Sequence, residues 1–504
     1  MDELYMVMPA TLDNLGFQPD PDASEPLYVQ LTVALSDAIR TGRIAVGSQL
    51  PSERFYAGQL GVSRTTVTAA YQELKGWGLV RGYVGRGAIV VTDDPDRAST
   101  DAIAWPQRSS RFSRSAPLAS VATNSGSIAF GDGRLHPSLV PHAALLASAA
   151  RAVENVEVLT KATPTLGCPA LRDALSETLR TTGIKTASTS EILVTGGAQQ
   201  GLNVIARTLI SPGDAVICES PTWHGAFQAF RAAGADVAGV PMDHEGIDPD
   251  LLEDALGRLR PKFVYLIPTF QCPTGRLMSL ERRRRILEIC VRFRTPIVES
   301  HVYGDIAFGE APPSLKSLDA AGIVIHQGSA SKTIGAALRL GWLVAPRAAI
   351  DLLAQAKASL DLSTPALTQA VFTNFLKSGG YGRHLPQFRA ALQTRRDVLI
   401  AALASYCPDL CHVTPQGGLY IWAQLPRSIQ AHEIEAAAAA EGVLVRSGDA
   451  FLPDGGTSSH IRLCYAAPGL DEIPAGAKRL GKALRTVLQR HRNPTAGDSA
   501  FAPV

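Results

Sequence analysis

Four short turns carry the residue types that could do chemistry, and each follows an apolar run that predicts a β-strand. They span residues 195–200, 219–223, 271–275 and 328–333. In the first turn, two glycines lead into a predicted helix, whose free backbone N–H groups can bind a phosphate. The last turn contains Lys332, whose side-chain amine is a nucleophile when it is neutral. One such turn is a weak signal, so the interpretation depends on all four together.

The elements that must position these turns alternate between strands and helices. Seven apolar runs predict strands at 192–195, 215–218, 236–240, 263–267, 297–299, 323–326 and 342–344. Helical stretches such as 198–209 and 280–292 separate most of these runs. This alternation predicts an α/β sheet with helices on both faces.

Beyond about residue 364 the chain becomes mainly helical, with later strands expected at 417–422 and 461–465. We therefore expect one α/β domain over residues 127–492, with a smaller subdomain at about 365–492.

In their order along the chain, these turns resemble the fold-type I enzymes that use pyridoxal 5′-phosphate (PLP), in particular the aspartate aminotransferase group. The Ser-x-Ser-Lys segment and the following Arg-Leu-Gly are the most specific part of this resemblance. The resemblance implies a mixed seven-stranded sheet with a small C-terminal subdomain, and a Schiff base between PLP and Lys332. It also implies donors to the phosphate, for which hydroxyl and cationic groups are suited. These donors are Ala198, Gln199, Ser329, Ser331 and Arg339.

The same resemblance assigns three further side chains. Trp223 would stack on the pyridine ring, and Tyr303 would bond the 3′-oxygen of the cofactor. Arg462 would pair with the α-carboxylate of an amino acid, and the alternative is a surface strand arginine without a ligand. No metal site is expected.

Three positions depart from the enzymes' pattern. Ser300 stands three residues before Tyr303, where an aspartate usually bonds the ring nitrogen. Cys272 stands where an asparagine often bonds the 3′-oxygen, and Ala162 stands where a tyrosine reaches the neighbouring subunit's phosphate. A neutral hydroxyl supports a protonated, electron-withdrawing ring far less than a carboxylate does.

Two interpretations of Ser300 follow. In the first, which we favour, PLP still binds, transamination is weak or lost, and the domain acts as a sensor. In the second, a shift of register gives Glu299 or His301 the aspartate's role and the activity survives.

The first part of the chain has a different pattern. Apolar spacing predicts a helix over residues 27–41. The sequence Pro51-Ser52-Glu53 is typical of a helix start and predicts a second helix that reaches about residue 60. Ser63 is a suitable N-cap for a third helix. Two β-rich runs within residues 79–91, around a Gly-Arg-Gly tip, predict a hairpin.

This order of elements resembles the GntR family of bacterial winged-helix regulators over about residues 26–92. Residues 27–92 contain seven basic and three acidic side chains, a net charge of +4, whereas the whole chain carries +2. Such an excess suits a surface that faces phosphates. The resemblance implies DNA contacts from Arg54, Arg64, Thr65, Thr66, Gly85 and Arg86. Whether Arg64 binds a guanine or only a phosphate stays open.

The fusion of the two parts resembles the MocR subfamily of GntR regulators over residues 26–485. Residues 1–25 would be an N-terminal extension, 93–126 a flexible linker, and 493–504 a tail. The resemblance implies a transcription regulator that binds double-stranded operator DNA, senses PLP or an amino compound, and forms a head-to-tail homodimer. The alternatives are an active aminotransferase that acts on an amino acid, and a dimerisation scaffold with an empty cofactor site.

Composition limits the class of protein further. No run of 18 or more apolar residues is present, so no membrane span is expected. The seven cysteines form no CxxC pair, which favours a reduced, cytoplasmic protein.

Overall fold

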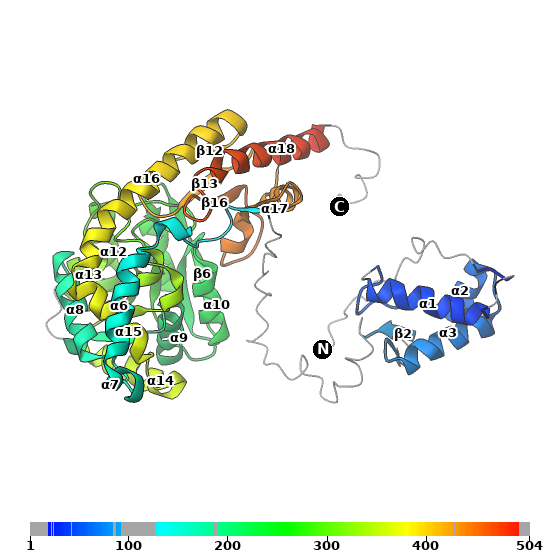
Figure 1. Ribbon diagram of the computed structural model, residues 1–504, viewed down its shortest axis with the longest axis horizontal. Helices are drawn as coiled ribbons and strands as arrows, with labels where there is room; N and C mark the ends of the chain where they lie inside the picture. The colour runs from blue at the N-terminus through cyan, green and yellow to red at the C-terminus, as the bar shows by residue number, and fades with distance from the viewer. Residues whose placement is uncertain are drawn as a thin grey trace. The chain divides into compact units, whose positions relative to one another are not determined.

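The computed structural model describes residues 19–91, except 22, 24, 42 and 84–86, and residues 126–492, except 185–188 and 428. The chain divides into two compact units, Met1–Arg114 and Ser115–Val504 (Figure 1). Gly85 and Arg86 at the expected wing tip lie outside the described residues. So do most of the expected N-terminal extension, nearly all of the expected linker, and the tail.

The N-terminal unit consists of three helices and a two-stranded antiparallel sheet. Its elements are α1 (Leu27–Arg40), α2 (Glu53–Leu60), α3 (Arg64–Gly76), β1 (Val80–Tyr83) and β2 (Gly87–Val90). The Ser52 side chain caps α2 and the Ser63 side chain caps α3, each by accepting a backbone N–H. The apolar stripes of all three helices meet in one core, which includes Leu35, Tyr71 and Leu74. The predicted helices and hairpin are confirmed.

The C-terminal unit is built on an eight-stranded sheet in the order β4-β11-β10-β9-β8-β5-β6-β7. The strands are β4 (Ile192–Thr195), β5 (Ala215–Ser220), β6 (Asp236–Asp243), β7 (Gly246–Ile247), β8 (Val264–Leu266), β9 (Ile297–Ser300), β10 (Val324–Ser329) and β11 (Gly341–Val344). The central pairs are parallel, and β11 runs antiparallel to both β10 and β4, so the sheet is mixed. All seven predicted strands are present. The predicted count is one too low, because β7 folds back on β6 as a short antiparallel partner.

Helices cover both faces of this sheet, as Figure 1 shows. On one face lie α9 (Ala198–Leu209), α10 (His224–Ala232) and α14 (Arg347–Asp361). On the other lie α11 (Pro249–Leu259), α12 (Leu280–Arg292) and α13 (Leu315–Leu318). Over β4 and β11 pack α8 (Pro169–Thr181) and α15 (Ala366–Lys377). The helices α6 (His142–Glu154) and α7 (Val156–Thr160) pack on α15.

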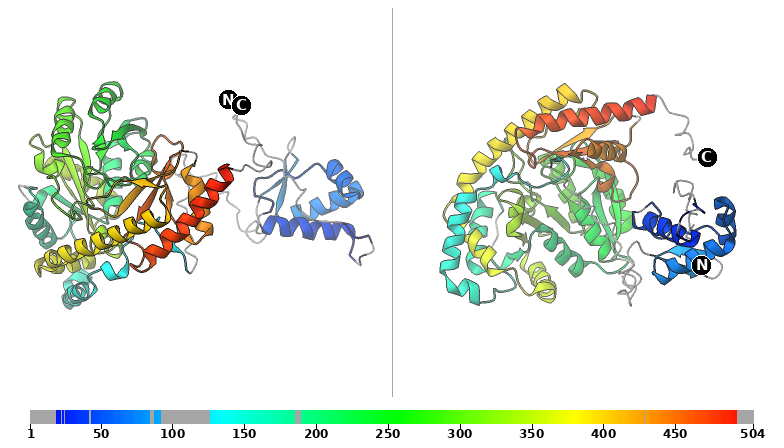
Figure 2. Two further views of the ribbon diagram at one scale, coloured as in Figure 1. Left: turned by 90° about the horizontal axis from the view of Figure 1, so that it is seen from above. Right: turned by 45° about the vertical axis from the view of Figure 1, so that its right-hand side comes forward.

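A smaller lobe surrounds a four-stranded sheet in the order β12-β13-β16-β15. Its strands are β12 (Cys411–His412), β13 (Tyr420–Gln424), β15 (Arg446–Ser447) and β16 (His460–Cys464). The 27-residue α16 (Gly380–Tyr406) reaches α18 (Glu472–Arg492), and the two helices lie side by side in Figure 2. The helix α17 (Ala431–Ala440) also belongs to this lobe and packs on α18.

A two-stranded parallel sheet joins distant parts of the sequence in this lobe. It pairs β3 (Ile128–Ala129) with β14 (Val443–Leu444). The segment after β3 is thereby held against the small lobe, which the sequence did not predict. Within the described ranges, no helix is long and apolar enough to span a bilayer.

Candidate functional site

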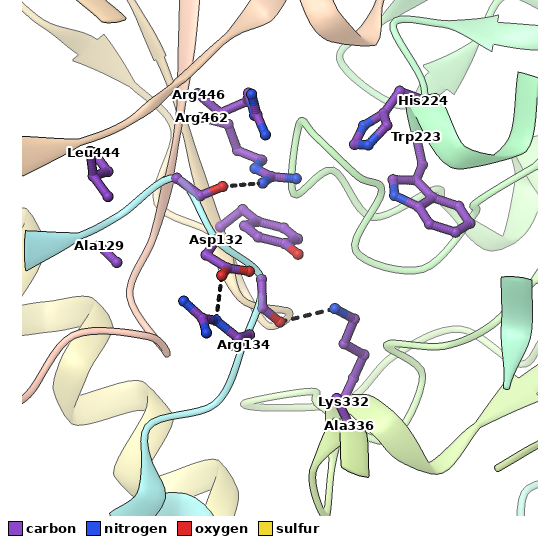
Figure 3. Close-up of a pocket in the computed structure, with 13 residues that line it drawn as sticks. Ala129, Asp132, Arg134, Trp223, His224, Lys332, Ala336, Leu444, Arg446 and Arg462 are labelled. Carbon is purple, nitrogen blue, oxygen red and sulfur yellow. Dashed lines mark hydrogen bonds and ion pairs between the residues drawn. The ribbon is translucent and has the colours of Figure 1, made fainter. Parts of the chain in front are cut away.

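A cavity of about 500 Å³ lies in the C-terminal unit (Figure 3). Residues that follow β5 and β10 of the large sheet form part of its wall, and residues of β13, β15 and β16 form another part. The lining residues are Ala129, Gly131, Asp132, Gly133, Arg134, Trp223, His224, Lys332, Ala336, Tyr420, Leu444, Arg446 and Arg462. Two of the four turns therefore meet here, and they bring Trp223 and Lys332 together.

The amine of Lys332 points into this cavity from the short helix that follows β10. Its Nζ donates a hydrogen bond of 2.9 Å to the carbonyl oxygen of Gly133. A Cβ on Gly133 would collide with the Tyr420 hydroxyl and lie 3.1 Å from Nζ, so this close approach requires glycine. Burial lowers the pKa of Lys332, which raises the fraction of neutral, nucleophilic amine.

Arg462 lies on the opposite wall and is 5 % exposed. It donates to the Gly131 carbonyl at 2.7 Å and to Cys272 Sγ at 3.6 Å. Its guanidinium carbon lies 4.4 Å from the centre of the Tyr420 ring and 4.8 Å from that of Phe451. Such rings hold a guanidinium in place. The structure thus buries this strand arginine at the cavity instead of exposing it at the surface.

Tyr303 and Tyr420 form a buried pair behind these cations. The Tyr303 hydroxyl donates to the Tyr420 hydroxyl at 3.3 Å, and the two rings meet edge to face at 5.8 Å. Burial raises the pKa of both phenols, so both stay protonated near neutral pH.

The start of α9 has the features of an anion site. Its N-cap is Gly197, with φ of +93°, and no side chain from the part of the chain that the structure describes caps the helix, so its first N–H groups are available to a ligand. The Arg339 guanidinium lies directly beside this glycine, where a Cβ would come within 2.9 Å of Nη2. Arg339 also donates to the Gly196 carbonyl at 3.3 Å. The predicted phosphate donors Ala198 and Arg339 are therefore neighbours.

The two predicted serines differ in their hydrogen bonds. Ser329 Oγ donates to the Leu340 carbonyl at 3.2 Å and accepts the Ser331 N–H at 3.2 Å. Ser331 Oγ is buried and has no hydrogen-bond partner within the described residues. The Gln199 side chain donates through Nε2 to the Gly225 carbonyl at 2.9 Å, so the predicted phosphate donor at this residue is its backbone N–H at the helix start.

Ser300 ends β9 and is buried beside the phenol of Tyr265. The preceding Glu299 points to the other face of the sheet, as alternation along a strand requires. Its carboxylate accepts the Leu315 and Lys316 N–H groups at 2.7 and 3.1 Å and lies 2.9 Å from His326 Nδ1.

The pKa values on that face have clear causes. Burial alone would raise the pKa of Glu299, but the His326 hydrogen bond and the nearby Arg283 guanidinium help to lower it to about 2. Burial lowers the pKa of His301 to about 4. The His301 ring lies 5.1 Å from that of His326, on the Glu299 side.

The sequence interpretation missed the segment 131–134, Tyr420, His224 and Arg446. Glycines 131 and 133, which alternate with charged residues directly after the linker, were the one local signal for this segment. Tyr420 and Arg446 occupy ordinary strand positions, and only the packing of the two lobes brings them to the cavity. His224 directly follows Trp223 as the first residue of α10, so the turn after β5 also places His224 there.

In the N-terminal unit, three of the predicted DNA contacts, Arg64, Thr65 and Thr66, form the first turn of α3, and Arg54 lies in the first turn of α2. The Arg64 side chain is 72 % exposed, with Nη2 3.6 Å from the Glu53 carboxylate. Glu53 also accepts the Thr68 hydroxyl at 2.8 Å. Arg54 and Thr65 are exposed, which leaves them free to meet a partner.

Thr66 is half-buried, and its hydroxyl lies 2.9 Å from that of Ser63. The N-terminal end of α3 therefore presents mainly Arg64 and Thr65 to solvent, and Arg54 is exposed on α2.

Comparison with known families and proteins identifies both units. Residues 27–90 match the gntR family of bacterial regulatory proteins, and residues 128–480 match aminotransferase class I and II. The crystal structure of LysN, an α-aminoadipate aminotransferase from Thermus thermophilus, superimposes with a TM-score of 0.72 at 33% identity. That match covers 77% of this chain and all of the other.

Two regulators match both units in one chain. YdfD, an HTH-type transcriptional regulator of Bacillus subtilis, is 30% identical over 480 residues, which is 92% of this chain and 98% of YdfD. MocR of Rhizobium meliloti, a probable rhizopine catabolism regulatory protein, is 30% identical over 84% of this chain and 87% of its own. The chain belongs to the MocR group of GntR-type regulators. This membership confirms the predicted fusion of a winged helix with an aminotransferase-like domain.

Proposed function

We propose that this MocR-type regulator binds PLP in the cavity of its aminotransferase-like domain and uses the complex to sense an amino compound. The observation that carries the proposal is the position of Lys332, whose amine lines the same cavity as Arg462 and Trp223. The start of α9 is linked to this wall through Gln199, which donates to the Gly225 carbonyl beside Trp223. These are the parts that an amine-linked, phosphate-bearing cofactor needs.

The unsatisfied groups of the site fit PLP. Within the described residues, Ser331 Oγ is buried without a partner, and no side chain caps the N–H groups at the start of α9 beside Arg339. A phosphate dianion would satisfy these donors together. Trp223 on the cavity wall and Tyr303 behind it suit the two further contacts proposed for the ring and its 3′-oxygen. Cys272 and Ser300 would lie against the cofactor in place of the more usual asparagine and aspartate.

When bound, PLP supplies an aldehyde that condenses with a primary amine, with loss of water, and a ring that withdraws electrons. The chain's own residues bind and orient the cofactor and the amino compound. Lys332 presents an amine whose lowered pKa favours the neutral form, and Arg462 binds and orients an amino acid's carboxylate. Tyr303 stays protonated and donates a hydrogen bond.

The geometry around Ser300 supports sensing over catalysis. A hydroxyl at this position would not hold a proton on the ring nitrogen as a carboxylate does. Glu299 already accepts two N–H groups and contacts His326 on the opposite face of the sheet. His301 lies on that side as well. An active aminotransferase would need one of these side chains to leave its place.

The DNA-binding part of the proposal depends on Arg64, Thr65 and Arg54, with Thr66, Gly85 and Arg86 as further contacts. The exposed positions of Arg64, Thr65 and Arg54 suit a recognition helix in the major groove of double-stranded DNA, and the hairpin of β1 and β2 suits a wing. We further propose a head-to-tail homodimer, which would place two DNA-binding units on paired half-sites, and a place in the cytoplasm with access to the chromosome. Ligand binding to one part would then alter the DNA affinity of the other.

A mobility-shift assay on the gene's own upstream DNA tests the proposal. We expect retardation by the full chain, a change in affinity when PLP and amino compounds are added, and loss of retardation in Arg64→Ala. Arg43→Ala is the control, because Arg43 is an exposed arginine of the same unit that pairs with Asp37. The absence of retardation at any salt concentration low enough for specific binding would overturn the regulator proposal. If the protein retards DNA but its affinity for DNA does not change when PLP or amino compounds are added, the result would favour a dimerisation scaffold.

A further inference from the structure

Two arginines extend into the cavity from neighbouring strands of the small lobe. Arg446 on β15 and Arg462 on β16 are direct partners in the antiparallel register. Both line the cavity, and Figure 3 shows their side chains close together, with His224 across from them. Like charges directly opposite each other on paired strands destabilise a sheet, so this pair calls for an explanation.

The charges around the cavity do not balance. Three arginines line it, Arg134, Arg446 and Arg462, against one acidic residue, Asp132. Asp132 is already paired with Arg134.

Arg446 has only a weak partner. Its Nη1 lies 3.5 Å from Glu435 Oε1, and the other Glu435 oxygen accepts the Ser447 N–H at 3.1 Å. The positive charge at the β15–β16 wall is therefore poorly compensated within the described residues.

The pKa of His224 is affected by the charges of both guanidiniums. Burial, and then the charges of Arg462 and Arg446, lower the pKa of His224 to about 4, so the ring is neutral at pH 7. Its Nδ1 is buried and finds no hydrogen-bond partner in the described part of the chain. A neutral imidazole can donate one N–H to an acceptor.

The two arginines differ in how firmly they are held. Arg462 lies between two rings and donates to a backbone carbonyl, so its direction is set. The Arg446 side chain is 21% exposed and has one long contact. A rigid cation suits the α-carboxylate that every amino acid has, and an adjustable one suits a group that differs between amino acids.

We propose that the cavity selects 2-amino acids whose side chain ends in an anion, a carboxylate or a sulfonate. Arg462 takes the α-carboxylate, and Arg446, with an N–H from His224, takes the side-chain anion. This inference rests on the proposed function, because it names the class of amino compound that the PLP-loaded domain senses. The side-chain anion supplies the negative charge that the cavity wall lacks.

Isothermal titration calorimetry of the PLP-loaded full chain tests this selection. L-Glutamate and L-glutamine have nearly the same shape and differ in one charge, and L-cysteate provides the sulfonate. We expect glutamate and cysteate to bind at least about tenfold more tightly than glutamine, the scale of one charge-assisted hydrogen bond.

In Arg446→Met, which keeps much of the aliphatic length, glutamate should bind roughly 10- to 100-fold more weakly while glutamine changes little. Arg446→Lys should retain most of the preference. Arg258→Met is the matched control, because it removes an exposed arginine that pairs with Asp254 on α11, outside the cavity lining.

The outcomes separate this inference from the proposed function. If glutamine and glutamate bind the wild type equally, or Arg446→Met retains the preference, the selection for anions is refuted while amino-acid sensing stands. If no amino acid produces heat or changes the absorbance of bound PLP, the proposed function itself fails. The comparison of ligands on the wild type decides the question even if a variant does not fold.

Discussion

Replacing Gly197 with alanine tests whether the start of α9 and Arg339 form one phosphate site. Gly197 has φ of +93°, which a side chain rarely adopts, and the new Cβ would come within 2.9 Å of Arg339 Nη2. The backbone cost is about 1–3 kcal/mol. The Arg339 guanidinium must also move away from the helix start. PLP would then lose the proposed charge-assisted hydrogen bond between its phosphate and Arg339, which is worth about 1.5–3 kcal/mol.

Gly213 provides the matched control. Its φ is +89°, and a Cβ there would meet nothing within 4 Å. Gly213→Ala should therefore lower stability by a similar amount without affecting the proposed site. We expect the Kd for PLP, measured by absorbance titration of the apoprotein, to rise roughly 10- to 100-fold in Gly197→Ala and less than about threefold in Gly213→Ala. Equal PLP affinity in the two variants would refute the assignment of Arg339 and the α9 start to the phosphate.

Three further predictions concern the cofactor, the reaction and the pH dependence. Lys332→Ala should lose the visible absorbance band of bound PLP and the response of that band to borohydride, and an unchanged spectrum would contradict our assignment of the amine. Ser300→Asp should speed half-transamination of amino acids in single-turnover measurements, because a carboxylate keeps the ring nitrogen protonated, and an unchanged rate would count against our account of Ser300. Burial raises the pKa of Glu219 from 4.5 to about 7. The contribution of the Glu219 carboxyl to the stability of the folded chain is therefore complete below about pH 4.5 and is lost as the pH rises through 7. Glu219→Gln should therefore gain stability relative to the wild type between pH 5 and pH 8, by at most about 3 kcal/mol, as measured by calorimetric melting of the apoprotein, and a constant difference across that range would argue against a buried carboxyl with a raised pKa.

The elements of both units could be predicted because their signals are local. Ser52 and Ser63 mark two helix starts by the N–H groups that their hydroxyls accept, and both caps are present. The seven predicted strands are short apolar runs between helices, and all of them form. The strand β7 escaped prediction because Gly246–Ile247 is too short to show any periodicity.

The cavity could be predicted only in part, for the same reason. Lys332 and Trp223 sit in turns that directly follow strands, so the sequence pattern reveals them. Tyr420 and Arg446 have no such mark, because their roles arise from contacts between the two lobes. His224 directly follows Trp223, but a histidine at a helix start carries no specific signal. The segment 131–134 reaches the cavity through the pairing of β3 with β14, more than 300 residues apart in the sequence.

The sequence by itself determined that a winged helix is joined to an aminotransferase-like domain, with a lysine, an arginine and an uncapped helix start in a recognisable order. It also determined that serine replaces the usual aspartate before Tyr303. Only the tertiary structure decided which face of β9 each side chain takes, and so that Glu299 is already bound to α13 and His326. Only the tertiary structure placed Arg446 opposite Arg462. The physical reason is that caps, turns and periodicity act over a few residues, whereas a binding cavity is formed by distant segments that meet through packing and strand pairing.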